Sequence, residues 1–156
     1  MRPLLLLTLP VLAGCHFPDD PDGTLDRVQN GQLRAGLSAR EPWTRVVDGK
    51  PAGPEVRLVE DFAAELSARV EWTVGSESDL FEALKKRDLD LVVGGLTDDT
   101  PWKDKVGLTE PYLKLDAGGR TERHIIAVAP GENRWLLRLE EFLRDQGDRV
   151  RREAGR

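Results

Sequence analysis

The sequence predicts an α/β fold in which a mostly parallel sheet is covered by helices. From residue 25 onward, segments with strand periodicity alternate with segments of helical periodicity. The run "LDLVVGGL" at 89–96 is apolar throughout, which is typical of a strand covered on both faces. A strand–helix–strand–helix–strand order favours parallel strands joined by helical crossovers. Because the chain has 156 residues, we expect one domain.

Each element of the first half follows from a local pattern. The segment 56–68 has apolar residues at helical spacing, whereas 69–74 alternates apolar and polar residues as a strand does. Ser76 or Ser78 is suited to cap the helix that follows. In chain order, we expect a strand at 33–38, a Gly/Pro-rich loop at 41–55, a helix at 56–68, a strand at 69–74, a helix at 78–88 and a strand at 89–96.

The C-terminal part is expected to add a hairpin, a strand and a helix. Ala117-Gly118-Gly119 has the composition of a hairpin turn, because glycine readily takes positive φ. A further strand is expected at 124–129. The last helix carries Trp135, Leu139 and Phe142 on its apolar face, and Gly147 is expected to end it.

The N-terminus predicts export and lipid attachment. "MRPLLLLTLPVLAG" starts with a positive charge and continues with a leucine-rich run. That run is shorter than the about 20 residues that span a bilayer, and it has the dimensions of a signal-peptide core. Cys15 follows "LAG" and resembles the lipidated cysteine of bacterial lipoproteins; an ordinary secretion signal ending near a cysteine is the alternative. The expected organisation is a signal peptide at 1–14, lipidated Cys15 with a flexible tether at 15–24, one lobe at 25–147 and a frayed tail at 148–156.

Composition and motifs exclude several classes of function. Hydrophobic residues make up 39% and charged residues 33%, an ordinary globular balance. The net charge of −5, with no long basic block, argues against nucleic acid as a partner. The single cysteine disfavours a disulfide or a cysteine metal site, and no H-E-x-x-H, G-x-S-x-G or phosphate loop occurs. We therefore expect no metal, no cofactor and no enzymatic activity, with His124 in a structural role and acidic turn residues solvated.

Four stretches in order resemble one known family. "GTLDRVQNGQLRAGLSAREPW" is followed by "DGKPAGPEVRLVEDFAAEL" and by "VEWTVGSESDLFEALKKRDLDLVVGGLT", and the pattern closes on "VGLTEPY". This order resembles lobe 1 of the family 3 solute-binding proteins, the polar amino-acid receptors of ABC importers. The resemblance covers roughly 24–112 and, more weakly, 124–146. It implies a three-layer αβα lobe of the type II periplasmic binding protein fold.

The same resemblance implies a set of ligand contacts. In such proteins the ligand lies at the carboxyl ends of parallel strands, between two lobes. Lobe 1 supplies an aromatic face, here Trp43, and the polar groups of a G-x-T turn, here Gly95 and Thr97. The family's carboxylate-binding arginine falls on Trp102, and Asp99 is a candidate counter-charge. These five residues are the predicted ligand contacts.

Two departures from the family limit what this site is expected to bind. Without the arginine, the acidic residues Asp98, Asp99 and Asp104 are expected to repel a free carboxylate and to favour a cationic or neutral solute. Only eleven residues separate Tyr112 from His124, which leaves no room for a second lobe. A single lobe buries less of a ligand than a closed pair does. The alternative is that Trp102 packs on the domain and the turn binds nothing.

The leading functional hypothesis is a lipid-anchored binding protein of the amino-acid ABC transporter type, at the periplasmic or cell-surface side of a bacterial membrane. It would bind a small polar or cationic solute, such as an amino acid or amine, weakly or with a partner such as a permease. The alternative is an interaction or scaffold lipoprotein that has lost solute binding. Its former ligand face, with Trp43 and Trp102, would dock another protein or a second copy of the chain.

Overall fold

Five strands form one mixed sheet in the order β4-β1-β5-β9-β6. The computed structural model describes residues 19–155, so the predicted signal peptide and Cys15 lie outside the described residues. β1 pairs in parallel with β4 and with β5, β9 is antiparallel to β5, and β6 is antiparallel to β9. β9 alone therefore runs antiparallel to the other four strands, which confirms the prediction of a mostly parallel sheet. The strands are β1 (Gln32–Leu37), β4 (Arg69–Val74), β5 (Leu91–Val93), β6 (Gly107–Leu108) and β9 (Ala127–Val128).

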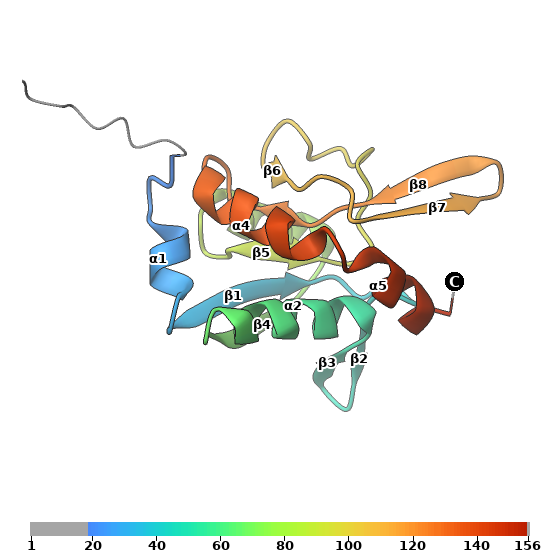
Figure 1. Cartoon of the computed structure of the whole chain (residues 1–156), viewed down its shortest axis with the longest axis horizontal. Coiled ribbons are helices and arrows are strands. Elements are labelled where there is room, and N and C mark those ends of the chain that lie inside the picture. The colour runs from blue at the N-terminus through green and yellow to red at the C-terminus, as the bar shows by residue number, and fades with distance from the viewer. Residues whose placement is uncertain (1–18, 156) are drawn as a thin grey trace, which may run out of the picture.

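Helices cover both faces of this sheet and make three layers (Figure 1). Leu91 and Val93 of β5 pack into the larger core, with Phe62 and Trp135, while Val92 packs into the smaller core. This alternation explains why the predicted strand is apolar throughout. On the larger core lie α1 (Thr24–Val28), α2 (Pro54–Glu65), α4 (Asn133–Leu143) and α5 (Gly147–Glu153), and on the smaller core lies α3 (Glu77–Lys85).

Local chemistry fixes where two helices begin and how the last long helix docks. Ser76, one of the two predicted caps, accepts a hydrogen bond from the Asp79 backbone N–H at 3.2 Å. α2 starts with Pro54, which suits the first turn because its missing N–H would have no helical partner. The Trp135 indole is fully buried and donates from Nε1 to the Asp90 carbonyl at 3.0 Å. That bond ties α4 to the start of β5.

The predicted hairpin is present, and it stands away from the sheet. β7 (Leu113–Ala117) pairs in antiparallel fashion with β8 (Arg120–His124). Gly118 and Gly119 form the turn with φ values of 56° and 82°, a region that favours glycine. In Figure 1 this two-stranded ribbon extends from the side of the domain, beyond α5. Its base joins the larger core through buried Leu113 and partly buried Leu115.

Three elements differ from the sequence expectation. The Gly/Pro-rich loop contains a small hairpin of β2 (Arg45–Val47) and β3 (Lys50–Ala52). The strand expected at 124–129 is divided between the end of β8 and β9. Gly147 begins α5 rather than ending the last helix, and a Cβ there would lie 2.3 Å from the Tyr112 carbonyl oxygen. The glycine permits a close approach, and the expected frayed tail is helical through residue 153.

The end of the expected tether is packed against the domain. Buried Glu132, before α4, accepts hydrogen bonds from the backbone N–H groups of Asp22 and Thr24, both at 3.2 Å. The Asn133 N–H donates to the Asp19 carbonyl at 2.8 Å. Residues 19–24 are therefore held at the start of α4. Within residues 19–155, no helix has the length and apolar character needed to cross a membrane.

Candidate functional site

The site lies where two neighbouring parallel strands end. β1 ends at Leu37 and β5 ends at Val93, and the Ser38 N–H continues their pairing by donating to the Val93 carbonyl at 3.0 Å. The loop after β1 and the turn after β5 therefore leave the sheet side by side. Crevices at such carboxyl ends are the common ligand sites of open α/β sheets.

Glu55, at the start of α2, holds the turn after β5. One of its carboxylate oxygens accepts the N–H groups of Gly94 and Gly95, both at 2.9 Å. The other oxygen accepts the Tyr112 hydroxyl at 2.6 Å. Glu55 is fully buried, and burial raises its pKa despite these donors. Three donors on one carboxylate fix the turn relative to the base of the hairpin.

Trp43 covers the same turn from the loop after β1. A Cβ on Gly95 would lie 2.2 Å from Cδ1 of the indole, so the two residues are in direct contact. Thr44 fixes the loop, because its hydroxyl donates to the Ser38 carbonyl at 2.6 Å and accepts from the Arg40 N–H at 3.0 Å. Trp43 is only 5% exposed, so it forms the floor of the site rather than a protruding face.

The hairpin joins the site at the end of β8. Thr97 and His124 form an antiparallel bridge. It is flanked by two backbone hydrogen bonds of 3.0 Å, from Asp98 N–H to the Arg123 carbonyl and from Ile125 N–H to the Leu96 carbonyl. The turn after β5 is thus paired with the strand that returns from the hairpin. A second wall is therefore built by the chain itself.

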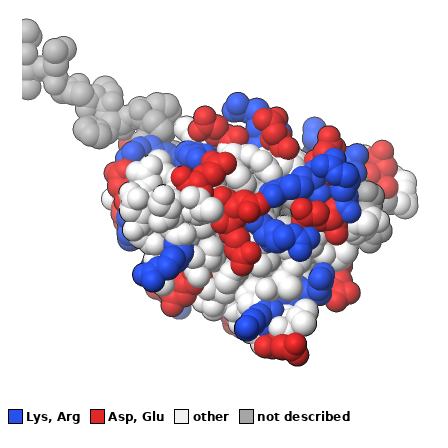
Figure 2. All heavy atoms as spheres, turned by 60° about the horizontal axis from the view of Figure 1, so that its bottom comes forward, with Lys and Arg blue, Asp and Glu red and all other residues white. Residues whose placement is uncertain are grey.

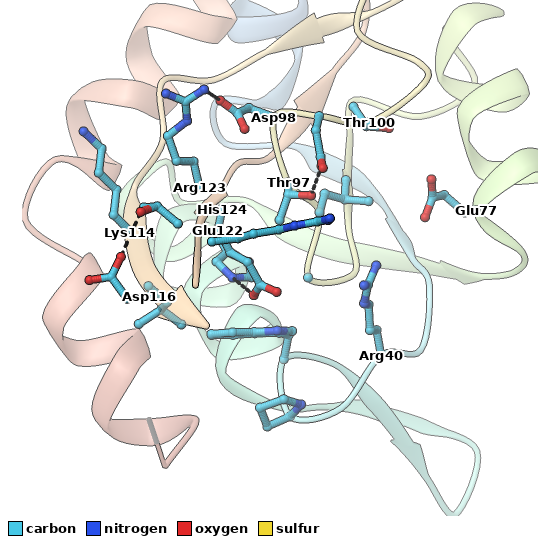
Figure 3. A pocket seen from close by; sticks show the side chains of 18 of the residues that line it. Arg40, Glu77, Thr97, Asp98, Thr100, Lys114, Asp116, Glu122, Arg123 and His124 are labelled. Atoms are coloured by element: carbon cyan, nitrogen blue, oxygen red, sulfur yellow. Dashed lines mark hydrogen bonds and ion pairs between the residues drawn. The ribbon is translucent and has the colours of Figure 1, made fainter. Parts of the chain in front are cut away.

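A pocket of about 1080 Å³ lies between these segments (Figure 3). Its lining comes from 40–43 after β1, from 95–101 after β5, from 114–116 and 120–124 of the hairpin, and from Glu77 at the start of α3. We call this cavity the strand-end pocket. It has the location that the resemblance predicts, and the hairpin supplies the side that a lone lobe was expected to lack.

The strand-end pocket has the expected excess of acidic side chains, and it also carries basic side chains that were not expected. Six carboxylates and four basic side chains line it. Arg123 pairs with Asp98 at 2.5 Å, and the Thr97 hydroxyl donates to Asp99 at 2.5 Å. The basic groups lie partly on the hairpin, a segment outside the motifs considered from sequence. Acidic and basic groups are likewise interspersed on the molecular face shown in Figure 2.

His124 is a buried histidine without a hydrogen-bond partner. Its side chain is 1% exposed, and neither ring nitrogen is hydrogen-bonded within residues 19–155. The nearest carboxylate oxygen, on Glu122, lies 3.5 Å from Nε2, and the ring centroid lies 4.3 Å from that of Trp43. Burial lowers the pKa of His124, which favours the neutral imidazole. An unsatisfied buried polar group costs about 1–3 kcal/mol, so His124 is an unusual feature of the pocket lining.

Four of the five predicted contacts meet in the strand-end pocket. Trp43, Gly95, Thr97 and Asp99 all line it. Trp102 does not: its ring stacks on Phe81 at 5.2 Å, in the smaller core beside α3. Its position gives no support to a role as a stacking face for a ligand.

Sequence reasoning missed two kinds of residue. It gave no role to Glu55, because a buried acidic residue in a helix looks like any solvated one in the sequence. It also assigned no ligand role to Arg40, Arg120 or His124, which the structure places in the lining. The available signal was the period-two spacing of β8, which places residues 120, 122 and 124 on one face.

Comparison with known proteins identifies the family. Residues 33–145 match the sequence profile of the bacterial extracellular solute-binding proteins, family 3. This chain belongs to that family. As a family 3 domain it has one lobe, and the pocket lies at the strand ends where the fold places ligands.

Solved structures support the one-lobe fold. A point mutant of the arginine-bound form of domain 1 from TmArgBP is 27% identical, with a TM-score of 0.70 over 78% of this chain and 96% of that one. The ancestral amino acid-binding protein AncCDT-1 gives a TM-score of 0.75 over 85% of this chain and 99% of that one. Its 16% identity shows likeness of fold alone.

Curated relatives include proteins that are several times longer than this chain. This family 3 domain is 32% identical over 95 residues to membrane-bound lytic murein transglycosylase F of Vibrio parahaemolyticus, covering 18% of that protein. It is 36% identical over 119 residues to the protein of the same name from Maricaulis maris, covering 26% of it. The chain thus spans between about a fifth and a quarter of the length of these relatives.

Proposed function

We propose that this family 3 domain binds a small polar or cationic solute, such as an amino acid or amine, in the strand-end pocket. The observation that carries the proposal is the pairing of Thr97 with His124, which joins the hairpin to the lobe along one side of the pocket. Gly95 and Thr97 offer polar groups, Trp43 an apolar floor and Asp99 a counter-charge. Binding needs no catalytic step.

A solved relative supports binding by one lobe. The TmArgBP structure is described as the arginine-bound form of domain 1, so a single domain of that protein holds arginine. At 27% identity, this likeness favours a basic amino acid as the first solute to test. Since an open pocket buries less of its ligand than a closed pair of lobes, we expect a dissociation constant near the millimolar range, about 4 kcal/mol of binding free energy.

The setting of this activity follows from the first fifteen residues. Their leucine-rich run and Cys15 favour a lipoprotein held at a bacterial membrane, outside the cytoplasm. A permease of the ABC type, or another partner that covers the open side of the pocket, is the expected protein partner. Palmitate labelling of the wild type and of Cys15→Ala tests the anchor, since only the wild type should be labelled.

Isothermal titration calorimetry of the purified protein tests the proposal. The panel consists of basic, neutral and acidic amino acids and of polyamines. We expect saturable heat with at least one basic amino acid, and we expect Thr97→Val to weaken it because the hydroxyl that positions Asp99 is removed. If no member of the panel gives saturable heat up to millimolar concentrations, solute binding by this chain is excluded.

A second candidate function follows from the transglycosylase relatives. Their name describes an enzyme that acts on murein, and the match covers 72% of this chain in the Maricaulis protein. The strand-end pocket would then take a solute released from murein, and the domain would serve a murein-processing system. Saturable heat with soluble murein fragments, and none with free amino acids, would favour this candidate.

The alternative of an interaction or scaffold protein relied on Trp43 and Trp102 as exposed contacts for a partner. Trp43 is buried beneath the pocket, and Trp102 is stacked on Phe81, so neither indole is presented as a protruding aromatic. Analytical ultracentrifugation distinguishes this alternative from solute binding. We expect one monomeric species with or without solute.

A further inference from the structure

Residues 19–24 are bound to the domain at one place, the start of α4. The buried carboxylate of Glu132 accepts the Asp22 N–H on one oxygen and the Thr24 N–H on the other, both at 3.2 Å. We call this junction, formed by residues 19–24 and Glu132, the N-terminal latch. Because the acceptor is buried and the donors are backbone groups, the latch fixes the course of the chain before α1.

An arginine and a second backbone contact complete the latch. Arg87, after α3, donates to Glu132 at 2.9 Å and also pairs with Asp22. The Asp19 carbonyl accepts the Asn133 N–H at 2.8 Å. The charge of Glu132 is therefore compensated in its buried position, as a stable buried carboxylate requires. The position of Asp19 is set by groups of the folded domain.

The latch and the strand-end pocket lie at opposite ends of the sheet. α1 follows the latch and leads into the amino end of β1, and Trp135 ties the start of α4 to the Asp90 carbonyl before β5. The pocket lies beyond the carboxyl ends of the same two strands. β1 has six residues, so its ends are on the order of 20 Å apart. Figure 1 shows α1 at one side of the domain and the β7–β8 hairpin, which lines the pocket, at the other.

The chain between Cys15 and the latch is short. Only residues 16–18 separate Cys15 from Asp19. A polypeptide spans at most about 3.6 Å per residue, so the four steps from Cys15 to Asp19 cover at most about 14 Å. A lipid on Cys15 would therefore stay near the latch, because this reach is shorter than the distance to the pocket.

We propose that the latch end of the domain faces the lipid surface to which Cys15 is attached, so that the strand-end pocket opens away from that membrane. The inference rests on the lipid attachment in the proposed function and adds a fixed orientation to it. A partner that covers the pocket would then approach from the side away from the bilayer. This orientation favours a partner outside that bilayer over a permease embedded in it.

The surface around the latch suits contact with lipid headgroups and not insertion into the hydrocarbon. Arg134 pairs with Asp26 at 3.1 Å, and both side chains lie at the surface. Arg27, on the same short helix as Asp26, pairs with Asp90 at 2.5 Å. Charged side chains are costly to place in the bilayer core. The covalent lipid would therefore supply the insertion, and the domain would rest at the level of the headgroups.

The test measures which end of β1 lies closer to the lipid. Gln29, before β1, and Glu41, after it, are both exposed. Gln29→Cys and Glu41→Cys are made in the full chain, isolated from the membrane fraction and labelled with bimane. A lipidated Cys15 has no free thiol, so the label attaches only to the introduced cysteine. The proteins are reconstituted in phosphatidylcholine vesicles that contain a lipid with a nitroxide headgroup, which quenches bimane at short range.

The Gln29→Cys label should be quenched more strongly than the Glu41→Cys label. We expect at least about a threefold difference, because β1 places the labels on the order of 20 Å apart. Cys15→Ala in either labelled protein should remove the quenching, since the protein would no longer be attached to the vesicle.

Variants of the latch test its part in the orientation. Glu132→Ala removes the shared acceptor and should free residues 19–24, so the chain from Cys15 to α1 could extend over about 30 Å. The two labels should then be quenched almost equally. Arg87→Gln removes one donor and should reduce the difference in part. Glu141→Ala is the matched control, because it removes an exposed carboxylate from the same helix.

Each outcome decides the inference. Equal quenching of the two labels with the latch intact, or stronger quenching at Glu41→Cys, would overturn the orientation and leave the lipid anchor in place. Absence of the protein from the membrane fraction would overturn the orientation together with the anchor. A difference that stays unchanged in both Glu132→Ala and Arg87→Gln would overturn the role of the latch. Calorimetry with L-arginine decides solute binding separately, and far-UV circular dichroism checks that the variants fold.

Discussion

The Tyr112 hydroxyl donates a 2.6 Å hydrogen bond to the carboxylate of Glu55, 57 residues earlier in the chain. The same carboxylate accepts both N–H groups of the Gly94–Gly95 turn. The base of the hairpin, the start of α2 and the ligand-facing turn therefore share one buried acceptor. The shape of the strand-end pocket depends on this junction.

Removal of the Glu55 carboxylate should destabilise the domain strongly. Glu55→Ala leaves three buried donors without an acceptor, and each costs about 1–3 kcal/mol, so we expect a loss of at least about 3 kcal/mol. Tyr112→Phe removes a single donor and should cost about 1–2 kcal/mol. Urea unfolding followed by tryptophan fluorescence measures both. Equal, small losses in the two variants would contradict the role of Glu55.

The stability of the domain should depend on pH through the same group. Burial raises the folded-state pKa of Glu55 above its ordinary value of 4.5. Since the folded state then holds its proton more tightly, the stabilisation is complete below pH 4.5 and is lost as pH rises through the raised pKa. Glu55→Gln should remove this part of the pH dependence. Urea midpoints of both proteins between pH 4 and pH 8 provide the measurement, and parallel curves would refute the assignment.

Gly95 should tolerate no side chain. Its φ of 60° disfavours other residues, and a Cβ would lie 2.2 Å from the Trp43 ring. Gly118 has a similar φ of 56° with no atom within 4 Å of such a Cβ, so Gly118→Ala reports the backbone cost alone, about 1–2 kcal/mol. Gly95→Ala should cost at least about 1 kcal/mol more and should weaken solute binding. Thermal unfolding and calorimetry test the two parts, and identical melting temperatures would contradict the contact.

Trp102 should matter for stability and not for binding. Its ring stacks on Phe81, and Trp102→Ala should cost about 1–3 kcal/mol because a large apolar contact is lost. Affinity for the bound solute should change by less than about twofold, whereas Trp43→Ala should abolish binding by removing the pocket floor. Trp102→Arg, which restores the family's usual residue, should not create carboxylate binding. A gain of L-arginine affinity in that variant would show that residue 102 faces the ligand.

The sheet and the main helices were predictable because their patterns are local. The apolar run around Leu91 predicts a strand that is buried on both faces. Ser76 predicts the start of a helix, because serine is a favourable N-cap residue. The turn at Gly118 and Gly119 was equally predictable, since few residues adopt positive φ at two successive positions. The short β2–β3 hairpin and α5 were not predicted, because short elements contain too few residues to show a hydrophobic period.

The site was predictable only where a sequence motif fixes both the place of a residue in the fold and the direction of its side chain. Trp43 and Gly95 belong to such motifs, and the structure places them in contact. Trp102 was placed by counting residues, and counting does not reveal which way a side chain in a turn points. Its partly buried ring packs against Phe81 instead. His124 and Arg120 depend on where the hairpin folds, which is a tertiary contact that no local pattern encodes.

The central claim is that the lobe and its hairpin together hold a solute in the strand-end pocket. Amide NMR spectra recorded during titration with L-arginine test it most directly, with agmatine and murein fragments as the comparison ligands. We predict saturable shifts of the amide signals of Gly95, Thr97, Arg120 and His124, and none for β4 or Trp102. Saturable shifts centred away from these residues, or no shift with any ligand up to millimolar concentrations, would contradict the claim.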